Sequence, residues 1–198
     1  LAQGLSRGGA ADRLALAEGT ALLANPPDAA ALELPLLGAA FRLHGAAVIA
    51  LTGAAMQMQA DGTPLPANTA HALPDGCVLR IGPARRGVFG YLHVDGGFDT
   101  PRLMGSRARH AIAGLGRAPR AGEHLPLGAP GRAQPGLMLD VADRLAGGTV
   151  RLRPTVHSPM FPEAAMQALL GQAFAPAAPG LRMGARLAAP AAMAAPDG

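Results

Sequence analysis

The segment YLHVDGGFDTPRLMGSR, residues 91–107, carries the change of pattern on which the fold of this chain depends. Up to Val94 it has the alternating pattern of a β-strand. Two glycines, a proline, two aspartates and a Gly-Ser-Arg triplet then follow in close succession. These residue types favour sharp reversals, because glycine reaches positive φ and aspartate bonds its own backbone. The segment therefore predicts a strand that ends in a tight turn bearing an arginine.

Further strands are expected elsewhere in the chain, because short apolar runs are punctuated by Gly, Pro and Asp. The Asp61-Gly62 pair inside an alternating run is a strong hairpin signal, since that dipeptide tolerates positive φ. We predict strands at residues 32–45, 46–53, 56–66, 77–81, 88–94, 123–128 and 149–153.

Two segments have helical patterns instead. In residues 11–25 leucines recur at helical spacing, Asp12 can cap the start, and the prolines at 26 and 27 stop the helix. Residues 161–174 form the second candidate, with Pro162 at the first helical position.

The composition favours β structure, because 27 glycines and 19 prolines among 198 residues argue against a helical bundle. Regularly spaced strands with only two helices predict a mainly β protein, either a β-barrel or a pair of β-domains. We place a first β-domain, including the amino-terminal helix, at residues 1–128. Residues 129–198 then hold a linker and the incomplete start of a second β-domain, because GAPGRAQPG at residues 128–136 is typical of a linker.

The charge is modest, since all 17 basic residues are arginine and the net charge is +4. Nucleic-acid binding is not expected, because the arginines are scattered and few aromatic residues are available for base stacking. The single cysteine, Cys77, excludes an intrachain disulfide and a Cys-based metal site. No apolar run predicts a membrane helix, and nothing at the amino terminus resembles a signal peptide. We therefore expect a cytoplasmic protein that binds neither nucleic acid nor membrane.

The pair Gly96 and Gly97 allows two interpretations. Glycines after a strand are found in phosphate-binding turns, but a P-loop needs a lysine and a dinucleotide fingerprint needs a following helix. The chain has no lysine, and Pro101 with no helical pattern after it argues against both motifs. A sharp reversal at a barrel rim is the interpretation we favour.

The polar residues around these glycines also have a catalytic and a structural interpretation. Asp95 and Asp99 are carboxylates that can exchange protons, but aspartates beside glycine are more often turn formers. Ser106 is a nucleophile only if a base lies near it, and the Gly-x-Ser-x-Gly pattern is absent. The structural alternative is that Ser106 and Arg107 bind a backbone or an anion.

Arginines and histidines complete the candidates. Arg102, Arg107 and Arg109 are able to bind a carboxylate or phosphate through two hydrogen bonds, or they form a solvated basic rim. The six histidines lack metal-ligand spacing, so no metal site is expected. A lone histidine in a strand, such as His93, is more often structural.

Taken together, several blocks of the chain resemble the biotin-dependent carboxyltransferase family, which comprises KipA, the C-type subunit of 5-oxoprolinase and the allophanate hydrolase subunit 2 domain. Residues 91–107 resemble the family pattern Tyr-Leu-x-Val-x-Gly-Gly-x-Asp-x-Pro-x-x-x-Gly-Ser-Arg. The other blocks follow in family order at residues 6–33, 48–54, 61–62, 114–128 and 181–187. Glu123 departs from the family pattern, which usually has Asp there, and residues 157–161 lack a Gly-Pro-Gln-type segment.

The resemblance implies a cyclophilin-like β-barrel domain that works with a partner subunit of similar fold, either KipI-like or the B-type subunit of 5-oxoprolinase. In bacterial 5-oxoprolinase, two such subunits and a third open 5-oxoproline to glutamate with ATP, so this chain would be a hydrolase subunit that is inactive alone. The first alternative is biotin-dependent carboxyl transfer to urea. The second is a KipA-like regulatory protein that binds a kinase inhibitor. No cofactor is expected to bind this chain directly, with ATP acting at the level of the complex.

The resemblance also implies a site at the partner interface. Its catalytic residues would be Asp99, Ser106 and Arg107, and its substrate-binding or partner-binding residues would be Gly96, Gly97, Asp12 and Arg182. Arg107 would hold a substrate carboxylate, and Asp99 would fix the loop or accept a proton.

Overall fold

The structure is a computed structural model that describes residues 8–177, 184 and 186–188. The chain divides into two compact units, Leu1–Ala146 and Gly147–Gly198. Among the described residues, the first unit contains one helix and six strands, and the second contains the remaining elements. The mainly β class with two short helices is therefore confirmed.

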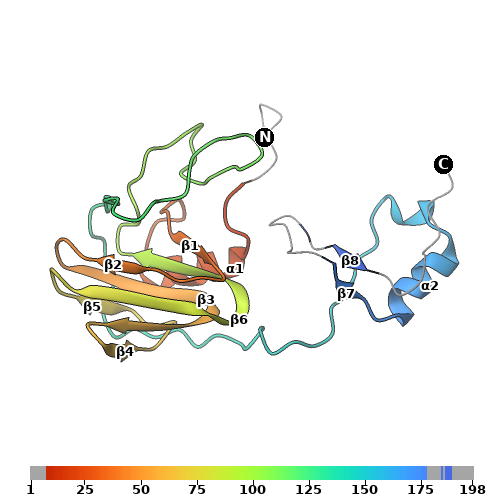
Figure 1. Cartoon of the computed structure of the whole chain (residues 1–198), viewed down its shortest axis with the longest axis horizontal. Helices are drawn as coiled ribbons and strands as arrows, with labels where there is room; N and C mark the ends of the chain where they lie inside the picture. The colour runs from red at the N-terminus through yellow and green to blue at the C-terminus, as the bar shows by residue number, and fades with distance from the viewer. Residues whose placement is uncertain (1–7, 178–183, 185, 189–198) are drawn as a thin grey trace. The chain divides into compact units, whose positions relative to one another are not determined.

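The centre of the first unit is a pair of long antiparallel strands, β3 (Ala47–Ala60) and β6 (Val78–Val94). Figure 1 shows them side by side, with shorter strands along both outer edges. β1 (Leu32–Pro35) and β2 (Ala40–Arg42) pair with β6, whereas β4 (Thr63–Leu65) and β5 (His71–Leu73) pair with β3. The described strands form an open sheet, and a closed barrel stays a prediction.

The hairpin expected at Asp61-Gly62 is confirmed, since β3 and β4 meet there and both residues have positive φ, 46° and 87°.

The two strands expected at residues 77–81 and 88–94 form the single strand β6 instead, so that prediction was wrong. Pairing of β6 with β3 shifts register between Met56 and Met58, opposite the stretch that contains Pro83. A bulge accommodates proline in a strand, because the ladder does not need its missing N–H there.

The strands expected at residues 123–128 and 149–153 are absent from the described structure, where both stretches are irregular. Leu127 makes only an isolated bridge to Phe98. A short apolar run becomes a strand only when an edge is available for pairing, and its sequence does not show whether one is.

The first predicted helix is confirmed as α1 (Arg13–Leu22), and the Asp12 carboxylate accepts a hydrogen bond from the Ala15 N–H at 2.9 Å. In the second unit, α2 (Glu163–Gly171) confirms the second helix, with Pro162 at its N-cap instead of its first helical position. The same unit contains the 3₁₀ helix η1 (Ser158–Met160) and the strand pair β7 (Ala175–Pro176) and β8 (Leu187–Ala188). No helix among the described residues is long and apolar enough to cross a membrane.

The first unit extends beyond the division expected after Gly128. Ala133 and Leu139 pack against a buried cluster of Leu22, Leu23, Ala50 and Ala70. Farther along, Arg144 donates to Glu18 of α1, with an Nη2–Oε2 distance of 2.8 Å. The Pro/Gly-rich segment that follows Gly128 therefore packs along the first unit, because its glycines allow a close approach to the backbone.

The two faces of the sheet have different character. One face contributes Leu51, Leu79 and Leu92 to the main apolar core. On the other face, Tyr91 and His93 lie in a row under α1, and Gly19 of that helix leaves room for the His93 ring. The predicted site follows directly from this row, at the end of β6.

Candidate functional site

The turn after β6 places Gly96 and Gly97 in the left-handed region, with φ of 82° and 73°. The Gly97 N–H donates to the Val94 carbonyl at 2.8 Å, and the Gly96 N–H donates to Oδ1 of Asn25 at 2.8 Å. Asn25 also donates from Nδ2 to the Val94 carbonyl at 2.8 Å, so one side chain binds both sides of the turn. Both glycine N–H groups are thus engaged within the protein.

Close packing explains why these positions are glycine. A Cβ built at Gly96 would lie 2.3 Å from the Ala129 carbonyl oxygen, and one at Gly97 would lie 3.0 Å from the Ala29 Cβ. Gly128 donates its N–H to the Gly97 carbonyl at 2.8 Å, which brings the crossing segment onto the turn. The turn therefore has the sharp reversal that the sequence favours, and positive φ and packing both require glycine.

Asp99 and Arg107 form an ion pair, with Nη2 of Arg107 donating to Oδ1 of Asp99. Nε of Arg107 donates to the Phe98 carbonyl at 3.0 Å, so the guanidinium is attached to the loop at two points. The Arg107 side chain is 18% exposed, whereas Asp99 is mostly exposed. Nη1 of Arg107 makes no hydrogen bond to the described residues and remains able to donate to a ligand.

Ser106 belongs to a small hairpin between these two residues. Its backbone pairs with Leu103 through hydrogen bonds of 2.8 and 3.0 Å. Its Oγ accepts a hydrogen bond from the Ala108 N–H at 3.1 Å. Ser106 therefore binds a backbone group in this structure, and its predicted catalytic role stays a prediction.

A second ion pair lies beside the first. Nη2 of Arg102 donates to Oδ2 of Asp28 at 2.6 Å. The hydrogen bond and charge of Arg102 lower the pKa of the Asp28 carboxyl, and Arg107 contributes in the same direction. Two arginines and two carboxylates therefore lie together, from segments about 70 residues apart in sequence.

Asp12 and Arg182 are not joined to this group in the described structure. Asp12 caps α1, and its backbone N–H donates to the Tyr91 hydroxyl at 2.8 Å, which in turn donates to Oε2 of Glu33 at 2.8 Å. Burial raises the pKa of Tyr91. Arg182 lies outside the described residues, and both residues' predicted roles stay predictions.

Asp95 has an unusual environment at the end of β6. It is 9% exposed, and its Oδ1 is buried with no hydrogen-bond partner among the described residues. Gly131 lies against it, since a Cβ built there would be 2.9 Å from that oxygen. A buried polar atom without a partner lowers stability, so this carboxylate has an energetic cost for the fold.

His93 occupies a structural position in the same row. Its Nε2 lies 3.2 Å from Oγ1 of Thr52, and that hydroxyl donates to the Ala15 carbonyl at 2.7 Å. Burial lowers the pKa of His93 from 6.5 to about 4. The ring is therefore neutral at physiological pH, which fits the structural interpretation of a lone strand histidine.

Sequence reasoning missed Asn25 and Asp28 as parts of this region. Asn25 lies at the end of the predicted helix, directly before Pro26, and an amide at that point can bind a nearby turn. The partner of Arg102 had no local signal, because Asp28 belongs to a distant segment. Among the residues that the structure describes, no group of three His, Cys, Asp or Glu side chains is placed to hold a metal ion.

A guanidinium that is still able to donate is a common feature of anion-binding sites, and such a role for Arg107 in this turn stays a prediction. The family model described as carboxyltransferase domain, subdomain A and B, matches residues 3–197. The chain therefore belongs to the carboxyltransferase domain family.

Curated relatives carry two kinds of name. The chain is 36% identical over 126 residues to the C-type subunit of 5-oxoprolinase from Haemophilus influenzae, covering 62% of this chain and 41% of the relative. Identity to the Escherichia coli protein of the same name is 31% over 129 residues, covering 63% and 42%. A putative urea carboxylase of Emericella nidulans is 32% identical over 133 residues, covering 64% of this chain and 11% of that protein. The chain thus spans about two fifths of the 5-oxoprolinase subunits it matches.

Solved structures agree with the fold. The crystal structure of TTHA0988 matches with a TM-score of 0.84 and 29% identity, covering 93% of this chain and 36% of that chain. The Kluyveromyces lactis urea carboxylase matches with a TM-score of 0.74 and 22% identity, covering 92% of this chain and 18% of that chain. The second likeness concerns the fold alone.

Proposed function

We propose that this chain is a subunit of an ATP-dependent 5-oxoprolinase, which opens 5-oxoproline to glutamate in the cytoplasm together with a partner of the B type. The observation that carries the proposal is the 36% identity over 126 residues to a C-type subunit of 5-oxoprolinase. The name of that relative describes one chain of a multi-subunit enzyme. We therefore expect this chain to be inactive alone and to act in a complex with the B-type partner and a third subunit.

The geometry of the turn supports a role in substrate binding. 5-Oxoproline has a carboxylate, and Nη1 of Arg107 is available to donate to one while Nε and Nη2 hold the side chain in place. Asp99 orients that guanidinium and lies on the exposed side of the loop, where it is able to accept a proton. Gly96 and Gly97 would shape the site, and Ser106 would hold the hairpin that carries Arg107.

ATP is expected to bind mainly elsewhere in the complex. The Gly96 and Gly97 N–H groups already bond Asn25 and Val94, so the turn lacks the free N–H groups that phosphate-binding loops present. The chain also has no lysine for a P-loop.

A second candidate is the carboxyltransferase component of a biotin-dependent urea carboxylase. The 32% identity to the putative urea carboxylase of Emericella nidulans favours it. In that case Arg107 would face a carboxylated carrier instead of 5-oxoproline. Urea-dependent removal of the carboxyl group from a carboxylated biotin carrier would distinguish this candidate from the first.

The test is ATP-dependent conversion of 5-oxoproline to glutamate by the chain co-expressed with the other two 5-oxoprolinase subunits of the same organism. We expect Arg107→Ala to raise the KM for 5-oxoproline at least about tenfold, the usual loss when an ion-pair contact to a ligand is removed. Arg86→Ala is the matched control, because it removes another exposed ion pair, the one with Asp143, and leaves Arg107 in place. Unchanged kinetics for Arg107→Ala would exclude the site, and absence of activity in the complete complex would exclude the function.

A further inference from the structure

Residues 100–124 form a lobe that has no core of its own. None of its residues is buried. Its two ends are held together by a hydrogen bond from the Asp99 N–H to the Pro126 carbonyl, at 2.7 Å. Figure 1 shows these green loops extending away from the sheet. The lobe therefore contributes little apolar burial to the first unit, and its apolar side chains need another explanation.

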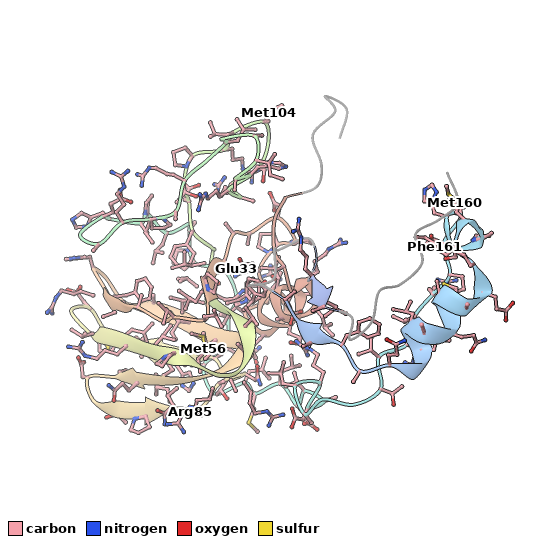
Figure 2. The ribbon with its side chains drawn as sticks, turned by 45° about the vertical axis from the view of Figure 1, so that its right-hand side comes forward. Glu33, Met56, Arg85, Met104, Met160 and Phe161 are labelled. Atoms are coloured by element: carbon pink, nitrogen blue, oxygen red, sulfur yellow. The ribbon has the colours of Figure 1, made fainter. Side chains whose placement is uncertain are left out.

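One end of the lobe is a two-residue hairpin turn between Leu103 and Ser106. Met104 and Gly105 have φ of 51° and 78°, and turns with two positive φ values favour Asn and Gly. Methionine in the left-handed region is strained, yet its side chain is 57% exposed and Leu103 beside it is 47% exposed. Figure 2 shows Met104 at the outer end of the lobe, away from the sheet residue Met56. Neither the turn nor the fold of the unit requires a methionine here.

A second turn presents another apolar residue in the same way. His110 and Leu115 pair through backbone hydrogen bonds of 2.8 and 3.1 Å, and Ile112 lies between them. Ile112 is 89% exposed. Two closed turns in one lobe thus each carry a large apolar side chain at an exposed position.

Positive charge is concentrated in the same lobe. Residues 100–124 contain five arginines and one glutamate, a net charge of +4 that equals the net charge of the whole chain. Arg117 pairs with that glutamate, Glu123, at 2.7 Å. Within the described part of the chain, Arg109 has no ion-pair partner. The lobe therefore combines apolar tips with an incompletely neutralised basic surface.

The composition of the lobe favours a protein as its occupant. Methionine and arginine are enriched at protein interfaces, and exposed apolar residues ringed by polar ones are typical of docking sites. The lobe has no Phe, Tyr or Trp, so it offers neither a stacking platform for bases nor an aromatic anchor for a membrane surface. Ion pairs to Arg102, Arg107 and Arg117 also hold these side chains in fixed positions, which lowers the entropy lost on docking.

We propose that the 100–124 lobe is a docking surface for a separate protein chain that presents an acidic face with apolar pockets for Met104 and Ile112. The choice of probe rests on the function proposed above, since the probe is the B-type 5-oxoprolinase subunit from the same organism. Met104 and Ile112 are the anchors, and Arg109 contributes attraction to the acidic face.

The test measures the affinity of the purified chain for that probe by calorimetry at two salt concentrations. Met104→Asn removes the apolar anchor while placing a residue that tolerates positive φ in the turn, so the fold should be retained. We expect this variant and Ile112→Ser each to weaken binding at least about tenfold, as loss of an interface anchor does. Arg109→Glu should slow association, and wild-type association should slow as salt rises, both measured by stopped flow.

Controls outside the lobe are matched by residue type. Met138→Asn changes another exposed methionine, 69% exposed, and Arg80→Glu reverses an exposed arginine on the sheet. Both should bind within about twofold of wild type, the effect typical of residues outside an interface. Equal binding by wild type and Met104→Asn would overturn the lobe assignment while leaving a catalytically active complex, and so the proposed function, intact.

Other outcomes separate the two proposals further. Lobe-dependent binding without 5-oxoprolinase activity would support the docking surface and exclude the function. No complex with the probe would overturn both. Lobe-dependent binding to vesicles containing one quarter phosphatidylserine in phosphatidylcholine, with no binding to the probe, would overturn the protein partner in favour of a membrane surface.

Discussion

Protonation of His93 should destabilise the first unit at mildly acidic pH. The ring is 2% exposed and lies under α1, where a Cβ added at Gly19 would come within 2.2 Å of it. The Thr52 hydroxyl donates to the Ala15 carbonyl, so it can only accept from His93, and the hydrogen of the neutral ring belongs on Nε2. Among the described residues, the aromatic ring paired with His93 is that of Tyr91, with ring centroids 6.5 Å apart. Nothing in these contacts stabilises a positive charge.

The magnitude follows from the difference in pKa between the folded and unfolded states. Burial lowers the pKa of His93 from 6.5 to about 4 in the folded protein. Between these values the unfolded chain binds the proton and the folded chain does not. The stabilisation is therefore complete above pH 6.5 and is lost as pH falls towards 4. The full loss is about 3 kcal/mol, of which about 2 kcal/mol should be lost by pH 5.

The assay is urea unfolding followed by circular dichroism at pH 7.5 and pH 5, for wild type and for His93→Gln. Glutamine is able to donate to Thr52 but does not titrate, so the variant should lose about 2 kcal/mol less than wild type between these pH values. Carboxyl groups such as Asp28 and Glu123, whose pKa values are lowered by arginines, titrate in both proteins and cancel. An equal loss in both proteins, or an NMR titration of His93 with a midpoint near 6.5, would refute the reasoning.

Three further predictions concern the same face of the sheet. Gly19→Ala should lower the free energy of unfolding by roughly 1–3 kcal/mol although alanine favours helices, because its Cβ would lie 2.2 Å from the His93 ring. Adding His93→Ala to this variant should restore part of the lost stability. A Gly19→Ala variant more stable than wild type would contradict this packing. Asp95→Ala should raise the free energy of unfolding by roughly 1–3 kcal/mol in urea titrations, because it removes a buried oxygen without a partner, and a destabilised variant would show that the oxygen has one. Tyr91→Phe should lower the free energy of unfolding by about 1–2 kcal/mol, because Glu33 and the start of α1 both lose a hydrogen bond to the hydroxyl. Thermal unfolding unchanged from wild type would argue against these two hydrogen bonds.

Several features of the fold were predictable because they depend on neighbouring residues. Asp61-Gly62 sets a hairpin through the φ values it allows, and Asp12 caps the helix that begins at the next residue. The glycine pair after β6 likewise predicted a sharp reversal. Each of these features is decided within about five residues, where backbone sterics and one side-chain hydrogen bond dominate.

Other elements were mispredicted because pairing decided them. Gly82 and Pro83 indicate a break between two strands, yet β6 continues through them, since β3 runs alongside and a bulge absorbs the proline. Residues 149–153 have a strand pattern but are irregular in the second unit. The intrinsic preference of a short segment for β structure is weak, and a strand forms only where a neighbouring strand has a free edge to pair with it.

The candidate site divides in the same way. The turn and the residue types at its tip were predictable from one continuous segment, residues 91–107, and the family resemblance from that segment together with blocks elsewhere in the chain. The fold was needed to show that Asn25 fastens the turn, that Arg102 pairs with Asp28 and that Arg144 binds Glu18, 126 residues away. With 17 arginines and 13 acidic residues the chain allows very many ion pairs. The folded backbone determines which of these pairs form, because it brings only a few within hydrogen-bonding distance. No local sequence pattern encodes this selection.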